Sequence, residues 1–203
     1  MTRFIPLIAL FAATPASAGD LTLRVLDTAG RPVENAVVSM SNGSPPSARA
    51  SGRYVMAQQG MAFRPFLLVV PVGAKVAFPN LDPTRHHVYS FSPTKKFELK
   101  LFAKDQSRSV TFDRPGVVAL GCNIHDAMSA FIYVTANDWT AKTDARGVAV
   151  ISGAPPSGGM LTVWHPYLRS PQGTMQLTIR PGQHAANVAI RLRPPPMRMD
   201  NGY

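Results

Sequence analysis

The sequence predicts an all-β protein made of two β-sandwiches, one inserted into the other. Short runs of β-branched and aromatic residues recur between Gly, Pro, Asn and Asp, and helical periodicity is hard to find after the first 18 residues. Nineteen prolines and fifteen glycines among 203 residues supply the many turns of such a fold. The pattern of the opening strands also returns after Trp139, which suggests that the two ends of the chain fold together.

The first 18 residues have the composition of a secretory signal peptide. Arg3 provides a positive charge, residues 4–13 an apolar segment too short to span a bilayer, and residues 16–18 a small-residue cleavage site. No later apolar stretch approaches the roughly 20 residues of a transmembrane helix. We therefore expect cleavage after Ala18 and export to the periplasm, without a transmembrane segment.

The outer sandwich is expected from two separated pieces, residues 19–45 and 137–195. The first piece offers only two alternating strands, at 21–25 and 36–40, and two strands are not stable alone. The second offers strands at 148–151, 160–164, 175–179 and 188–192 and lacks a partner face. Together they make one sandwich, with the middle region inserted at an exposed loop, where insertions are well tolerated. The alternative is three separate modules in a row. Residues 196–203 are expected to form a disordered tail.

The middle region, residues 54–136, is expected to form a second sandwich. Its candidate strands number seven, enough for a small Greek-key fold, and they lie at 66–70, 74–78, 87–92, 96–102, 107–113, 117–122 and 130–135.

One loop of this region concentrates metal-binding side chains. Cys122 is the only cysteine in the chain, with His125 three residues later and Met128 three beyond that. A thiolate, an imidazole and a thioether are ligand types of blue-copper sites, which need a second histidine; His86 and His87 lie upstream. An exported protein has little reason to keep a lone thiol unless it has another role. Zinc is the chemical rival, but structural zinc sites do not recruit methionine.

These motifs resemble the cupredoxin family, in particular its plastocyanin and amicyanin branch. Asn80 two residues after Phe78, His86 eight residues after it, and the spacing C-x₂-H-x₂-M match amicyanin. The outer pieces resemble the carboxypeptidase regulatory-like, transthyretin-type sandwich through their turns at 25–33 and 143–147. The whole arrangement is similar to exported proteins described as methylamine-utilisation or plastocyanin-like.

The resemblance implies one type 1 copper ion. Cys122 and His125 would be equatorial ligands and Met128 the long axial one, while Asn80 would tie the two ligand-bearing loops together. The upstream ligand stays open between two neighbours. The family spacing selects His86, whereas strand alternation places His87 on the face of the aromatic residues at 89 and 91.

The function expected from this site is single-electron transfer with a redox protein, a cytochrome or a dehydrogenase. Electrons would pass at the edge of His125, where Ala127 and Ala130 leave a small apolar surface. Two rivals remain open: copper delivery, and an envelope-binding module whose copper site is vestigial. No phosphate-binding loop, nucleophile elbow, HExxH motif or acid pair is present, so we expect no enzyme.

Charge and the remaining side chains add weaker expectations. The formal charge of +10 favours an acidic redox partner or weak contact with an anionic surface, and the lack of a compact basic run argues against nucleic acid. His165 and His184 are expected on the surface. Met56 and Met61 are expected to pack in the interior.

Overall fold

The computed structural model describes residues 19–43, 48–125 and 127–195, and every regular element in these ranges is a β-strand. The all-β expectation is confirmed. The expected signal peptide, the expected tail at 196–203, and Asp126 lie outside the described residues. Nothing in the described ranges is helical, so they hold no helix that could cross a membrane.

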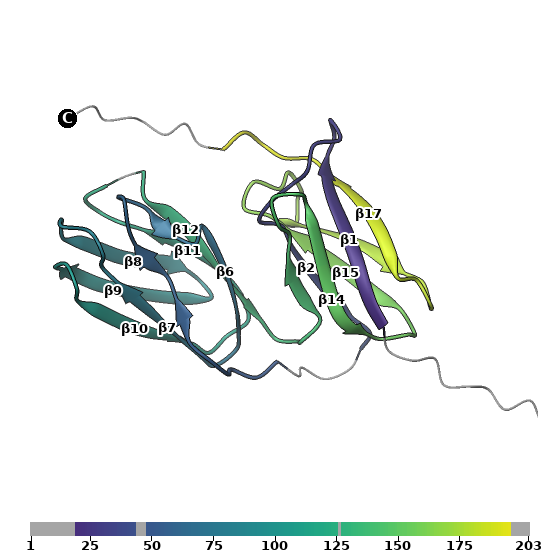
Figure 1. Ribbon diagram of the computed structural model, residues 1–203, viewed down its shortest axis with the longest axis horizontal. Helices are drawn as coiled ribbons and strands as arrows, with labels where there is room; N and C mark the ends of the chain where they lie inside the picture. The colour runs from purple at the N-terminus through teal and green to yellow at the C-terminus, as the bar shows by residue number, and fades with distance from the viewer. Residues whose placement is uncertain (1–18, 44–47, 126, 196–203) are drawn as a thin grey trace, which may run out of the picture.

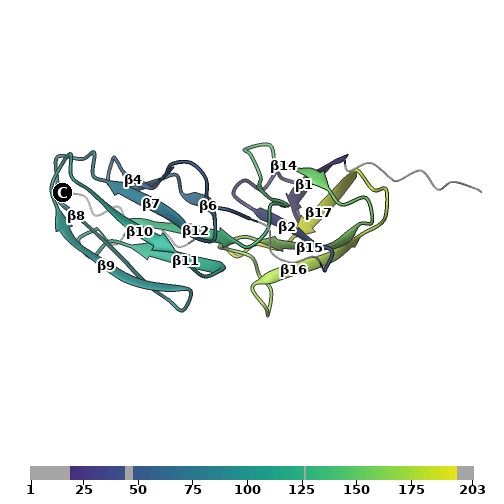
Figure 2. The same cartoon turned by 90° about the horizontal axis from the view of Figure 1, so that it is seen from below.

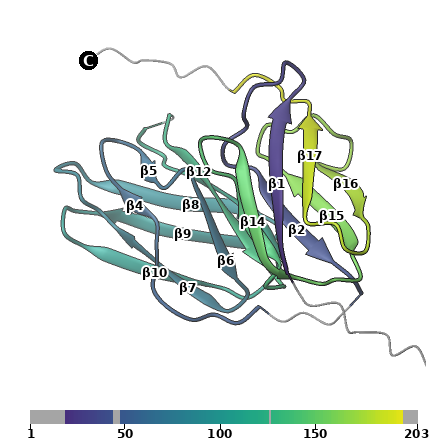
Figure 3. The same ribbon diagram turned by 45° about the vertical axis from the view of Figure 1, so that its right-hand side comes forward.

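The outer sandwich combines the first two strands with the last five. One sheet has the order β14-β1-β17 and the other the order β13-β2-β15-β16; Figure 3 shows β14, β1 and β17 side by side. The strands are β1 (Gly19–Asp27), β2 (Val37–Ser41), β13 (Thr140–Lys142), β14 (Val148–Ala154), β15 (Gly159–Trp164), β16 (Thr174–Ile179) and β17 (Ala185–Ile190).

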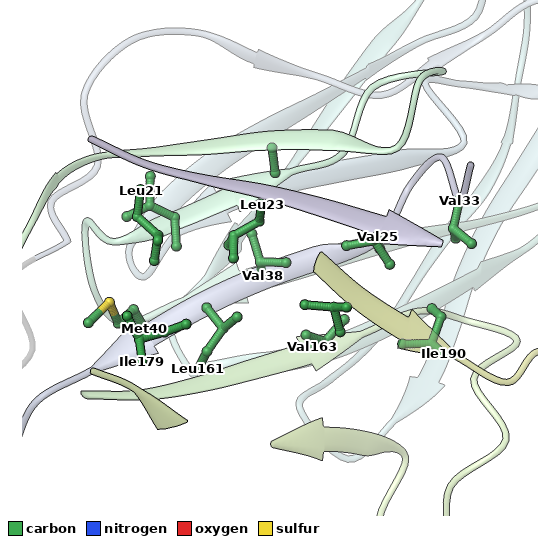
Figure 4. Close-up of a cluster of buried hydrophobic side chains, with 14 of the residues drawn as sticks. Leu21, Leu23, Val25, Val33, Val38, Met40, Leu161, Val163, Ile179 and Ile190 are labelled. Atoms are coloured by element: carbon green, nitrogen blue, oxygen red, sulfur yellow. The ribbon is translucent and has the colours of Figure 1, made fainter. Parts of the chain in front are cut away.

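Simple alternation builds the core of this sandwich. Leu21, Leu23 and Val25 of β1 are buried while the residues between them are exposed, as the period of a strand requires. Figure 4 shows these side chains facing Val38 of β2 and Leu161 of β15 across the space between the sheets. Burying each such side chain contributes about 1.5–3 kcal/mol, so the core stabilises the union of the two separated pieces.

The middle sandwich contains all strands between β2 and β13. A five-stranded sheet has the order β6-β12-β11-β8-β9 and faces a three-stranded sheet of order β10-β7-β3, with a small β4-β5 hairpin beside them. Its strands are β3 (Tyr54–Val55), β4 (Ala57–Gln58), β5 (Phe63–Arg64), β6 (Leu67–Pro71), β7 (Ala74–Pro79), β8 (His86–Ser92), β9 (Lys95–Phe102), β10 (Ser107–Phe112), β11 (Gly116–Gly121) and β12 (Ser129–Thr135).

The two sandwiches lie side by side, with β6 on the side that faces the outer sandwich (Figures 1 and 2). Trp164, at the end of β15, packs against the rings of Phe131 and Tyr133 on the outer face of the five-stranded sheet, with centroids 5.8 and 5.6 Å away. Val37 and Leu67 are buried in the same cluster. The division into two domains, 19–45 with 137–195 and 54–136, remains a prediction. The sheet topology supports it, because β1 and β2 pair only with strands from β13 onward.

Some side chains lie where the sequence did not place them. His165 is buried, with only 7% of its surface exposed, whereas surface exposure was expected. Met61 was expected in the interior but is 58% exposed, because it sits in a tight turn with φ of 52°. Met56 is fully buried and His184 is exposed, as expected. The short strand β13 was not predicted, since three residues carry too little pattern.

Candidate metal centre

The end of the middle sandwich brings together three of the metal-binding side chains. β8 begins at His86 and its neighbour β11 ends at Gly121, so the loop that follows β11 lies beside the start of β8. One ligand atom each from His86, Cys122 and His125 lies within 4.8 Å of the other two, the only such group found among the described residues. The rings of His86 and His125 are 5.1 Å apart between centroids.

A buried carboxylate orients His86. The Nε2 atom of His86 lies 2.8 Å from Oδ2 of Asp82, and both side chains are almost entirely inaccessible to water. The N–H groups of Gly60 and Met61 donate to the same carboxylate over 2.7 and 2.9 Å. Burial raises the pKa of Asp82, but the hydrogen bonds from Met61 and Gly60 and from His86 outweigh it, and the pKa lies below its usual value.

This contact decides which nitrogen of His86 is free. An ionised carboxylate can only accept, so the proton of neutral His86 must reside on Nε2. Nδ1 then carries the lone pair, and it is buried without a hydrogen-bond partner among the described residues. A carboxylate that fixes the tautomer of a metal-binding histidine is the usual outer partner in metal sites. The arrangement presents an imidazole ready to bind a cation.

The loop after β11 supplies the other donors. Cys122 lies just past the end of β11, rather than ending the strand as expected, and it is 3% exposed with a free thiol. Nδ1 of His125 is buried and, in the described part of the chain, has no hydrogen-bond partner. The N–H of Met128 donates to the carbonyl of His125 over 2.9 Å, which closes a tight turn. Met128 is fully buried in the apolar cluster that contains Cys122.

His87 lies outside this group. Its Nε2 atom is 2.8 Å from Oε1 of Glu98 on β9, on the other face of the sheet. The alternation argument for His87 assumed that Tyr89 and Phe91 mark the interior. In fact Phe91 is 78% exposed and the interior face of β8 carries Val88. That assumption was wrong, because aromatic side chains here lie on the outer face of the sheet.

Asn80 stiffens the loop that leads to His86. Its side-chain amide donates to the carbonyls of Thr84 and Phe102 over 2.8 and 3.1 Å, and its oxygen accepts the N–H of Asp82. These bonds fasten the loop between β7 and β8 to the end of β9. They hold the loop that carries Asp82 and His86; the expected tie to the second ligand-bearing loop is not among the hydrogen bonds of the described residues.

The surface near His125 is partly apolar. Ile124 is 48% exposed and Ala127 is exposed, while His125 itself is half-buried. Ala130 was expected to share this surface, but it is fully buried because it points inward from β12.

The donor set fits copper. One thiol and two imidazoles with unpartnered Nδ1 atoms converge, and the thioether of Met128 is buried in the same apolar cluster as the thiol. Soft donors of this kind select copper. Buried polar atoms normally have partners. Among the described residues, Oε1 of Gln58 and Nδ1 of His86, His87 and His125 have none. His86 and His125 also belong to the ligand group with Cys122, and for these two a bound ion is a direct explanation.

Sequence reasoning missed Asp82. A signal was present, because Asp82 precedes His86 by four residues in a short loop closed by Pro83. Two of the three hydrogen bonds that converge on the Asp82 carboxylate, however, come from the turn at 60–61 and could not be read from spacing.

No protein-family model and no curated protein matches the chain. Among solved structures, a copper-containing nitrite reductase from Thermus scotoductus SA-01 is similar at 24% identity over 56% of this chain, with a TM-score of 0.40; the chain spans only 28% of that enzyme. A purple cupredoxin from Nitrosopumilus maritimus is 19% identical, covering 40% of this chain and 99% of its own, with a TM-score of 0.37. A reduced amicyanin variant is 26% identical over 48% of this chain and 98% of its own, with a TM-score of 0.38.

Proposed function

We propose that this protein is an exported type 1 copper protein that carries single electrons between redox proteins in the periplasm. The observation that carries the proposal is the convergence of His86, Cys122 and His125 within 4.8 Å. His86, Cys122 and His125 would hold a single copper ion, with Met128 as a further, weaker donor, and the ion would supply a Cu(II)/Cu(I) couple.

The chain's own contribution is a rigid set of donors. Asp82 fixes the ring of His86, the turn from His125 to Met128 is closed by a backbone hydrogen bond, and Cys122 sits in a packed apolar cluster. A site that moves little keeps the same donors in both oxidation states, which favours electron transfer. The half-buried edge of His125, beside exposed Ile124 and Ala127, is where a redox partner would approach the site.

Burial argues against copper delivery as the main role. His86 is fully buried and Cys122 is 3% exposed, so releasing the ion to another protein would require the loop to open.

Titration of the purified, metal-free protein with Cu(II) tests the proposal. We expect one equivalent to give intense visible absorption and a reversible reduction potential. Cys122→Ser should lose the absorption while keeping the fold, because the variant removes only the thiolate. Copper binding without a reversible potential, or rapid loss of Cu(I) to a chelator, would instead indicate delivery. A folded protein that shows no copper-dependent absorption would contradict the proposal and leave the envelope-binding role.

A further inference from the structure

The outer face of the five-stranded sheet is divided into a covered half and an exposed half. Over β6 and β12 it packs against Trp164 of the outer sandwich. Strand pairing places Ala119 opposite Phe131, and Tyr89 opposite Gly121, on this same face. The exposed half, which we name the open face, consists of Tyr89, Phe91, Lys96, Glu98, Lys100 and Ala119.

The open face has an apolar hollow at its centre. A depression of about 400 Å³ is lined by the strands β8 and β11, including Tyr89, Phe91 and Ala119. Phe91 is 78% exposed, and its ring lies 5.0 Å from that of Tyr89. Exposed aromatic side chains are enriched at protein–protein interfaces, where they give large contact area at low entropic cost. The exposed ring of Phe91, packed on the half-buried ring of Tyr89, therefore indicates a docking surface.

This surface reaches the metal-binding loop through one contact. The ring of Tyr89 lies so close to Gly121 that a Cβ atom there would be 2.6 Å from Cζ of Tyr89. Gly121 directly precedes Cys122 in the chain. The Tyr89 ring thus touches the backbone of the residue next to the thiol, which joins the open face to the site without passing through His125.

Charge identifies the kind of partner. Lys96 and Lys100 project from the exposed positions of β9, and Glu98 between them is bonded to His87. The chain as a whole carries a formal charge of +10. A second copy of the chain would bring lysine against lysine, so self-association through this face is opposed. An acidic surface with an apolar centre would be complementary.

We propose that the open face docks an acidic redox protein, and that one electron passes between it and the copper site by way of Tyr89 and the Gly121–Cys122 backbone. This inference rests on the proposed function. In the transfer, the partner's centre is oxidised by one electron as Cu(II) is reduced to Cu(I). No covalent bond forms or breaks, and no proton is transferred. The open face is distinct from the His125 edge and gives the protein a second point of exchange.

Stopped-flow reduction of the copper-loaded protein by a reduced plant-type [2Fe–2S] ferredoxin, an acidic protein, tests the transfer. Lys96→Glu with Lys100→Glu should lower the bimolecular rate at low salt by about tenfold or more, since charge steering changes association by 10- to 1000-fold. Reduction by ascorbate should be unaffected, because no ligand is touched. The matched control is Arg24→Glu with Lys75→Glu, the same change in net charge at exposed positions on β1 and β7.

Binding can be mapped without copper, which separates this inference from the proposed function. Unlabelled ferredoxin added to the ¹⁵N-labelled, metal-free protein should shift amide signals of β8, β9 and β11, and Phe91→Ser should weaken binding about fivefold or more. Shifts confined to the loop around His125, an equal rate loss in the control variant, or self-association through Phe91 would each overturn the proposal. Failure of copper loading with intact binding would reject the proposed function alone.

Discussion

Both sandwiches contain buried histidine side chains, but these differ in whether the Nδ1 atom of the ring has a hydrogen-bond partner. In the outer sandwich, Nδ1 of His165 accepts the N–H of Tyr167 over 3.1 Å. The buried hydroxyl of Thr143 in the same sandwich accepts the N–H of Ala36 and donates to the carbonyl of Val33. In the middle sandwich, Nδ1 of His86 and of His125 have no partner among the described residues. A domain that only needs stability satisfies its buried polar atoms. The described residues hold four such unpartnered side-chain atoms, Oε1 of Gln58 and Nδ1 of His86, His87 and His125, and all four belong to the middle sandwich. Two of the four, on His86 and His125, belong to the ligand group with Cys122, so the middle sandwich is the one suited to binding an ion.

Replacing His86 and His87 in separate variants tests most directly whether the unpartnered Nδ1 of His86 marks a copper ligand. His86→Ala should lower copper affinity by about 100-fold or more and abolish the visible absorption, because it removes a ligand. His87→Ala should retain the absorption, since His87 contacts Glu98 on the other face. Copper titrations of the two variants check this. Equal losses in both, or a loss only in the His87 variant, would reverse the assignment.

Truncation of Trp164 tests whether the sandwiches depend on each other for stability. Trp164→Ala should destabilise the protein by about 3–5 kcal/mol, because it empties the contact with Phe131 and Tyr133. Denaturant unfolding measures this, and the copper spectrum should not change. Unfolding at the wild-type midpoint would show that the contact contributes little.

The buried histidine of the outer sandwich should make stability depend on pH. Burial lowers the pKa of His165 to about 4, against a hydrogen bond to the Glu34 backbone that raises it. Between pH 6.5 and 4 the unfolded chain therefore binds a proton that the folded chain does not, so stability falls as the pH falls through this window.

The loss should reach roughly 2 kcal/mol below pH 4, after allowing for screening by nearby solvent. His165→Asn keeps an acceptor for Tyr167 and should lose this part of the pH dependence. The measurement is unfolding of both proteins, without metal, across this pH range. Parallel curves for the two would show that His165 is not the group responsible.

The smallest expected effect comes from the carboxylate behind His86. Asp82→Asn keeps the shape but can donate to Nε2, which removes the fixed tautomer, so copper affinity should fall about 10- to 100-fold. The control is Asp113→Asn, an exposed carboxylate bonded to Lys95. Competition with a copper chelator, together with the reduction potential, gives the comparison. Unchanged values for Asp82→Asn would mean that the ring of His86 is held by packing alone.

The all-β class could be predicted because strand alternation and turn residues are local signals. The strand 107–113 was placed to within one residue of β10, since its alternation begins and ends at clear turns. The short strand β13 could not be predicted, because it exists only through its pairing with the distant strand β2. The exposed position of Met61 could not be predicted either, because its turn, with φ of 52°, is held by a hydrogen bond to the distant Asp82 side chain.

Only part of the candidate metal site could be predicted from the sequence. Cys122, His125 and Met128 form a compact motif, and the proximity of His86 follows from strand order. Asp82 escaped notice because its partners, Gly60 and Met61, come from a turn more than twenty residues away. The alternation of His87 with Tyr89 and Phe91 pointed to the wrong face of the strand, because alternation alone does not distinguish an aromatic outer face from the core.

X-ray absorption at the copper edge, recorded on the loaded protein, tests the central claim most directly. The account predicts one short sulfur contact and two imidazole nitrogens around each copper, with the sulfur lost in Cys122→Ser and one imidazole lost in His86→Ala. A copper ion surrounded only by nitrogen and oxygen in the unaltered protein would contradict it.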